Sequence, residues 1–182
     1  MTIVTNLTKV EEYLSKIVGT PYVWWMGATI LGKDTGPFYA VNGPAPDPEV
    51  VKNMGVCCTG VVNLARRKLG LSVPGVEEQD PFAGGTGAWY KFLKPHLQPF
   101  DPTKTYEPGT LFFRPYMTFE DQGHIGIKLE GDTFLHSYVE VPVPREGLCE
   151  PGCSRNETWA TSHNWHPEGY YLYTAPPSAW LI

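Results

Sequence analysis

The feature that most constrains the fold is a change of hydrophobic period along the chain. Near the N-terminus, and again from Cys58 to Lys68, apolar residues recur three or four positions apart, as they do on one face of a helix. From Pro108 onward, apolar and polar residues alternate, as they do in half-buried strands. Helices followed by strands predict an α+β fold in which N-terminal helices pack on a central antiparallel β-sheet.

The same patterns give approximate element boundaries. A first helix is expected over residues 7–18, with Thr5 or Asn6 as its N-cap. A second helix should run from Cys58 to Lys68, with Gly70 just beyond its C-terminal end. The pattern also predicts a short helix over residues 86–93 and strands over residues 110–114, 124–129, 133–139 and 169–174.

The length and the turn residues predict how the chain is divided. A chain of 182 residues is expected to form one domain over residues 1–182. Gly-Pro, Asn-Gly-Pro and Pro-Asp-Pro sequences predict a long loop insertion over residues 27–54. Residues 144–168 read as a loop-rich C-terminal extension. Loops of such length in a compact domain are usually functional or wrap the surface.

Charge and composition bear on partners and on compartment. A net charge of −5 gives no electrostatic basis for binding nucleic acid or an anionic membrane. The first twenty residues lack the basic start and the apolar run of a signal peptide. We therefore expect a chain that is cytoplasmic as synthesised, and its release would need a non-classical route. Adjacent Cys57 and Cys58 are poorly placed to bridge each other, which favours a reducing compartment.

Three residues suggest nucleophilic chemistry. Cys58 stands at the predicted start of a helix, where backbone dipoles favour a thiolate. His124 opens a strand, and His136 follows twelve residues later. A turn at residues 130–132 would pair these strands as a hairpin, with each histidine six residues from Glu130. The two imidazoles would then share one face of the sheet at similar height, and His136 would be partly exposed.

Four short motifs resemble, in order, those of the NlpC/P60 cysteine peptidases, which are papain-like. The first is G-T-P-Y-V-W at residues 19–24, and the second is C-T-G-V-V at residues 58–62. The third is P-G-T-L-F-F at residues 108–113, and the fourth is H-I-G-I at residues 124–127. Two departures from the family pattern stand next to the nucleophile motif, because Cys57 replaces the usual Asp and Thr59 replaces the usual Ser.

The resemblance implies a function and a set of site residues. It implies a cysteine hydrolase that cleaves peptide or isopeptide amide bonds, mostly in bacterial cell-wall peptides, through a Cys-His-His triad and an acyl-enzyme. No metal or organic cofactor is implied. The implied catalytic residues are Cys58, His124, His136 and Tyr22, and those expected to contact the peptide or muropeptide substrate are Trp24, Trp25, Thr59 and Gly123.

Other interpretations stay open at this stage. Cys57 could be the nucleophile, although the family register favours Cys58 and leaves Cys57 as a core or N-cap residue. An amidase or acyltransferase of the same fold could act on a substrate outside the cell wall. A non-catalytic, zinc-stabilised interaction module is the alternative from a different class. Its ligands, which could equally form a disulfide or neither, would be Cys149, Cys153, His163 and His166.

Overall fold

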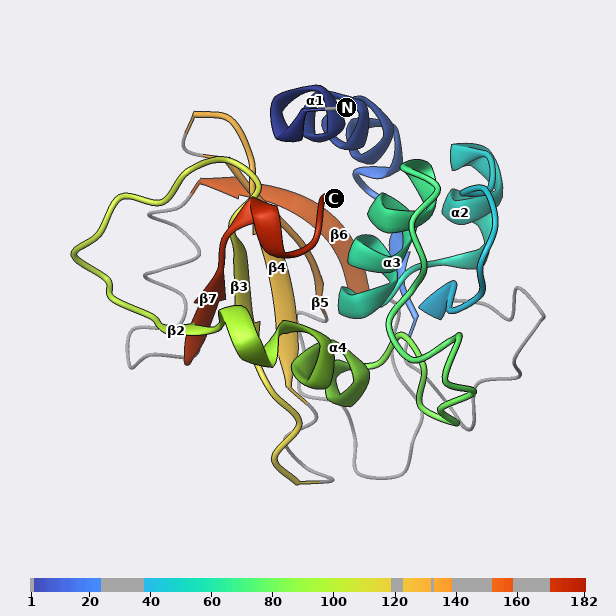
Figure 1. Cartoon of the computed structure of the whole chain (residues 1–182). Coiled ribbons are helices and arrows are strands. Elements are labelled where there is room, and N and C mark those ends of the chain that lie inside the picture. The colour runs from blue at the N-terminus through green and yellow to red at the C-terminus, as the bar shows by residue number, and fades with distance from the viewer. Residues whose placement is uncertain (1, 24–37, 119–122, 132, 139–151, 159–170) are drawn as a thin grey trace.

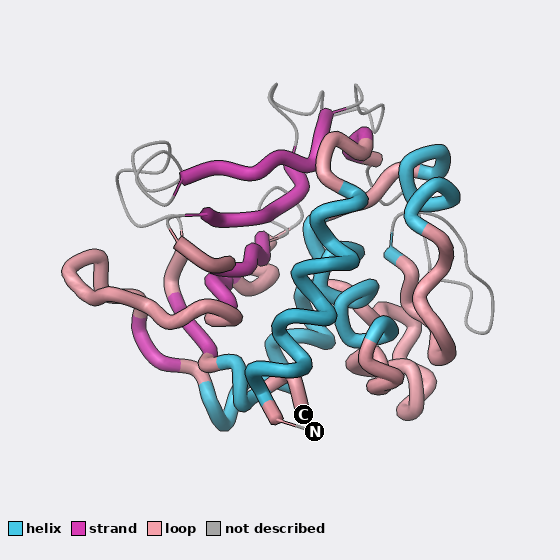
Figure 2. Tube along the Cα trace, turned by 90° about the horizontal axis from the view of Figure 1, so that it is seen from above, coloured by secondary structure: helices cyan, strands magenta, loops and turns pink. Residues whose placement is uncertain are grey.

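The structure is a computed structural model that describes residues 2–23, 38–118, 123–131, 133–138, 152–158 and 171–182. Its elements form two layers, with helices on one side and strands on the other, as the view from above shows (Figure 2). The longer helices are α1 (Ile3–Leu14), α2 (Pro48–Met54), α3 (Cys58–Lys68) and α4 (Thr86–Leu93). Short 3₁₀ turns are η1 (Ser15–Ile17), η3 (Lys94–His96) and η4 (Pro177–Ala179). The α+β fold class predicted from the sequence is confirmed.

A seven-stranded sheet forms the second layer, in the order β1-β6-β5-β4-β3-β7-β2, and every named pairing is antiparallel (Figure 1). Strands β3, β4 and β5 lie at its centre and carry both candidate histidines. The strands are β1 (Pro21–Tyr22), β2 (Gln98–Pro99), β3 (Leu111–Arg114), β4 (His124–Lys128), β5 (Thr133–Tyr138), β6 (Gly152–Thr158) and β7 (Tyr173–Ala175).

The first helix begins earlier than the sequence predicted. Thr2, and not Thr5 or Asn6, is the N-cap of α1, because its side chain accepts a hydrogen bond from the N–H of Thr5. Asn6 has a different role. It is buried, and its side-chain amide donates to the carbonyl of Leu181 across 2.6 Å, which ties the two ends of the chain together.

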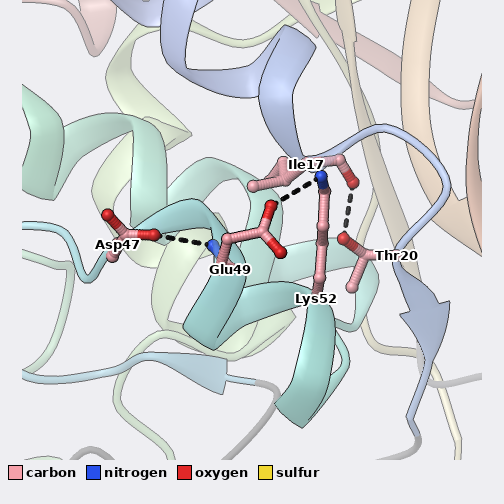
Figure 3. Close-up of polar contacts among 5 residues, drawn as sticks. All are labelled: Ile17, Thr20, Asp47, Glu49 and Lys52. Atoms are coloured by element: carbon pink, nitrogen blue, oxygen red, sulfur yellow. Dashed lines mark hydrogen bonds and ion pairs between the residues drawn. The ribbon is translucent and has the colours of Figure 1, made fainter.

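Part of the predicted loop insertion over residues 27–54 is helical. Pro46-Asp47-Pro48 reads as loop chemistry, yet Asp47 is the N-cap of α2 and Pro48 occupies the first turn, where a proline costs no hydrogen bond. Figure 3 shows the Asp47 carboxylate accepting from the N–H of Glu49, and Glu49 paired with Lys52 at 2.9 Å. Thr20, drawn in the same view, donates to the carbonyl of Ile17 and so closes the turn that leads into β1.

The hairpin between β4 and β5 has a register two residues away from the predicted one. Ile127 pairs with Leu135, so His136 lies opposite Gly126 and not opposite His124. The loop is centred on Gly131, whose φ of 61° suits a glycine, and this shifts the pairing by two positions. Because side chains alternate with a period of two, both histidines stay on one face as diagonal neighbours.

The sheet packs against a different apolar cluster on each face. The larger cluster joins α1 and α3 to side chains that include Ile125, Ile127 and Leu135. The smaller cluster is aromatic, and its members are Phe112, Phe134 and Tyr171, with Phe100 and Tyr106 packed against them. Alternation along β4 and β5 places His124 and His136 on the same side as this aromatic cluster.

The C-terminal third contains one strand that the sequence did not predict. Strand β6 lies within the predicted loop-rich extension and pairs with the whole of β5, from Thr133 opposite Thr158 to Tyr138 opposite Cys153. The strand predicted over residues 169–174 is β7, which begins later and pairs with β2 and β3. Strand β5 is therefore an interior strand, paired on both sides.

Candidate active site

The chain just before α3 is held by strands on two sides. Val56 forms a parallel bridge with Tyr22, and its N–H donates to the carbonyl of Pro21 at 3.0 Å. The carbonyl of Val56 accepts from the Ser137 hydroxyl at 2.7 Å, across a separation of 81 residues. Both Val56 and Ser137 are fully buried. These bonds fix the position of Cys58, two residues further on.

Cys57 is the N-cap of α3, one of the two roles that the sequence left open for it. Its sulfur accepts from the N–H of Gly60 at 3.4 Å and lies 3.4 Å from the Thr59 hydroxyl. Burial raises the pKa of the Cys57 thiol, which disfavours the nucleophilic thiolate form. Thr59 is also buried and its hydroxyl belongs to this cap, while its contact with a substrate stays a prediction.

Cys58 is the first residue of α3 and is partly exposed. Its thiol has an elevated pKa, chiefly because of burial and secondarily because of the neighbouring Cys57. Backbone N–H groups of Ile125, Thr59 and Cys58 itself oppose this rise by favouring the thiolate. The sequence led us to expect that the helix dipole lowers the pKa of Cys58. The pKa is raised instead, because the effect of burial is larger than that of the backbone N–H groups.

The raised pKa predicts how Cys58 should respond to alkylation. A thiol that holds its proton more tightly has less thiolate at neutral pH, and only the thiolate reacts. Labelling of Cys58 by iodoacetamide should therefore be slow at neutral pH. It should rise about tenfold per pH unit and continue rising beyond the ordinary thiol value of 9.0. Peptide mass mapping of timed samples would measure it.

The control for that experiment is a short unstructured peptide containing one cysteine, whose labelling should level off near the ordinary thiol pKa. If labelling of Cys58 were already maximal at mildly acidic pH, a thiolate–imidazolium pair would exist in the resting protein. The burial argument would then be wrong.

The structure brings His124 and His136 into direct contact. The Nε2 of His124 lies 2.9 Å from the Nδ1 of His136, and the rings meet edge to face. His136 is fully buried, although the sequence predicted partial exposure. Strand β6 pairs along the second edge of β5, so β5 is an interior strand, and the Phe134 ring packs on the imidazole with its centre 5.2 Å away. A hydrogen bond in such a setting is stronger than one in water.

Gly126 makes room for this pair. It stands between His124 and Lys128 on the same face of β4, directly opposite His136. A Cβ at this position would overlap the ring of Phe134, so the ring lies over the strand where a side chain would otherwise project. The glycine of the H-I-G-I motif therefore has a packing role next to the histidines.

Tyr171 contacts the histidine pair, which the sequence did not predict. Its hydroxyl lies 3.4 Å from the Nδ1 of His136, and its ring centre is 6.0 Å from that of His124. It also packs on Phe112 and Phe134 within the aromatic cluster. The residue stands 35 positions from His136 in the sequence, and no pattern in the chain connects the two.

Cys58 lies at the same end of β4 as the histidine pair. The backbone of Ile125, the residue after His124, lowers the pKa of the Cys58 thiol and partly offsets the effect of burial. Within the described part of the chain, no hydrogen bond joins the Cys58 thiol to His124 or His136. The structure thus brings the two imidazoles together, while the role of Cys58 stays a prediction.

The remaining predicted site residues have different outcomes. Tyr22 is buried on β1 and is itself the residue that forms the bridge with Val56. Gly123 precedes His124 with a φ of 77°, and a Cβ there would overlap the carbonyl of Arg114. Trp24 and Trp25 lie outside the described residues. So do three of the candidate zinc ligands, Cys149, His163 and His166; Cys153 lies on β6, where only the backbone is described.

Comparison with known proteins gives three solved structures of similar description. One is the NlpC/P60 domain of the peptidoglycan hydrolase SagA, with 16% identity over 96% of this chain and 98% of that one, and a TM-score of 0.42. Another is an NLP/P60-family protein similar to a lipoprotein, from Staphylococcus aureus, with 17% identity over 83% of this chain and 41% of that one, and a TM-score of 0.42. The third is the P60 domain of an antigen from M. avium subspecies paratuberculosis, with 17% identity over 84% of this chain and 96% of that one, and a TM-score of 0.43. The chain spans less than half of the S. aureus protein.

No family model matches the sequence, and no curated protein matches it. Within the described residues, no helix is both long enough and apolar enough to cross a membrane. All three solved structures are NlpC/P60 domains, the family whose motifs the sequence resembles. Because the TM-scores are low, a function must be argued from the site residues themselves.

Proposed function

We propose that this protein is a cysteine hydrolase that cleaves amide bonds in peptides, with Cys58 as nucleophile and His124 and His136 as its proton-handling pair. The observation that supports this most strongly is the buried 2.9 Å contact between the two imidazoles on β4 and β5, together with the packing of α3, which begins at Cys58, against β4. The backbone of Ile125, the residue after His124, contributes to the environment of the Cys58 thiol, which supports placing the thiol near this end of β4. A thiol, a base and a residue that orients the base are the parts that such catalysis needs.

The raised pKa of Cys58 shapes the mechanism. A thiol that is neutral at rest must lose its proton as it attacks, so His124 acts as a general base during the step. Its Nε2 faces His136, which leaves Nδ1 to accept the proton. The Cys58 sulfur then forms a bond to the substrate carbonyl carbon.

The rest of the cycle follows from that arrangement. His124 gives the proton to the departing amine as the C–N bond breaks, leaving a thioester on Cys58. A water molecule, deprotonated by His124, attacks the thioester carbon and releases the carboxylic acid. The thiolate then takes the proton back from His124. Backbone N–H groups at the start of α3, with the Tyr22 hydroxyl, would stabilise the oxyanion.

The proposed substrate class is the stem peptide of the bacterial cell wall. Its support is the ordered set of four motifs, which resembles a family acting mainly next to D-glutamate or a diamino acid. Trp24 and Trp25, which we propose contact such a substrate, lie outside the described residues. Localisation remains a proposal of the same kind, in which a chain made in the cytoplasm is released by a non-classical route.

One experiment tests the reaction and the substrate class together. The protein is incubated with muropeptides, with a γ-glutamyl and isopeptide library, and with ordinary α-peptides, and the products are identified by mass. We expect cleavage beside a D-residue or at an isopeptide bond. Cleavage of α-peptides alone would contradict the cell-wall assignment. Products that carry an added amine in place of water would identify an acyltransferase.

A further inference from the structure

The contact between the two histidines leaves one question of protonation. His124 Nε2 and His136 Nδ1 lie 2.9 Å apart, and when both rings are neutral one of these two nitrogens carries the shared proton. If it belongs to His136 Nδ1, then His124 must carry its own proton on Nδ1. His124 could not then accept a proton from Cys58.

Catalysis by the proposed route therefore needs the other arrangement. His124 must donate from Nε2, and the Nδ1 of His136 must be an acceptor, with the His136 proton on Nε2. Both rings are nearly or fully buried, so bulk water is poorly placed to select the tautomer. A neighbouring protein group has to favour it.

Tyr171 is placed to do so. Its hydroxyl lies 3.4 Å from the Nδ1 of His136, the nitrogen that must remain unprotonated. A phenol can donate to an imidazole nitrogen, and here it would share the Nδ1 lone pair with the shorter bond from His124 Nε2. Two donors directed at this nitrogen favour the ring whose Nδ1 is unprotonated. The phenol ring is held by Phe112 and Phe134, at centre distances of 5.8 and 5.7 Å, so the hydroxyl has a defined position.

We propose that Tyr171 is a positioning residue that holds His136 as its Nε2–H tautomer, by donating a hydrogen bond to Nδ1, and so keeps His124 in the form that accepts the Cys58 proton. The catalytic part of this inference rests on the proposed function. The tautomer part concerns the protein alone. It can be measured without any substrate.

The test uses Tyr171→Phe, which removes the hydroxyl and keeps the ring packing. In the ¹⁵N-labelled full chain, long-range ¹H–¹⁵N spectra near neutral pH distinguish protonated from unprotonated imidazole nitrogens. We expect His136 Nδ1 to be unprotonated in the unmodified protein and partly protonated in Tyr171→Phe. With an active substrate, kcat should fall roughly tenfold while KM stays unchanged.

Tyr106→Phe is the matched control. Tyr106 packs against the same aromatic cluster, but its hydroxyl bonds to the backbone of Asp101 and not to a histidine. It should alter neither the histidine spectrum nor kcat. A protonated His136 Nδ1 in the unmodified protein, or an unchanged spectrum in Tyr171→Phe, would overturn the inference. If the protein cleaves no substrate, the proposed function fails, but the spectra still decide the tautomer.

Discussion

Cys58→Ser should reduce peptide hydrolysis by at least about a thousandfold, whereas Cys57→Ser should leave it nearly unchanged. The two cysteines are adjacent but have different roles. A serine at position 58 keeps the shape but is a much poorer nucleophile, because its hydroxyl ionises far less readily than a thiol. A serine at position 57 still supplies an N-cap acceptor for the N–H of Gly60. Product formation followed by mass would measure both variants.

The Cys57 variant is also the folding control for that experiment. Serine is one of the preferred N-cap residues, so Cys57→Ser should begin α3 at the same place. If Cys57→Ser abolished activity and Cys58→Ser kept it, the nucleophile would have been assigned to the wrong cysteine. If both variants remained active, the histidine pair would serve some other chemistry.

Gly126→Ala should lower the free energy of unfolding by about 1–3 kcal/mol or more, the usual cost of overpacking a core. The added Cβ would overlap two ring atoms of Phe134 and lie in tight contact with a third, and this fully buried side chain has little room to move. Phe134 also packs on His136, so any displacement of the ring should disturb the imidazole pair. Denaturant unfolding of the purified variant would measure the loss.

Gly87→Ala is the matched control for this substitution. Gly87 lies in α4, and a Cβ there would meet no atom within 4 Å. Alanine is favoured over glycine in a helix, so this variant should be as stable as the parent, or more stable by up to about 1 kcal/mol. Equal effects of the two alanine substitutions would mean that Phe134 does not depend on the missing side chain of Gly126.

The helices and the pairing of the two histidines could be predicted because both depend on residues close together in the sequence. The bounds of α3 and α4 agree with the prediction, since a helical period and suitable flanking residues mark both ends. The predicted hairpin register was wrong by two residues, but His124 and His136 still lie on one face, because a shift by an even number of residues does not change the face of a side chain. A turn sequence alone does not determine how the strands pair.

Other features depend on the folded environment and left no trace in the local sequence. Strand β6 has the sequence G-C-S-R-N-E-T, whose polar residues lack the alternation that marks a half-buried strand. Tyr171 reaches His136 only through the pairing of distant strands. The direction of the Cys58 pKa shift depends on burial, which a helix start alone does not reveal.

Two successive residues of β5, on opposite faces of the strand, both contact the candidate site. His136 contacts His124 on one face, and Ser137 holds the carbonyl of Val56, two residues before Cys58, on the other. A one-residue insertion or deletion upstream of His136 within the strand would exchange the faces and remove both contacts at once. Among chains that share this site, we therefore expect the length between residues 133 and 138 to be invariant, while the turn at residues 130–132 is free to vary.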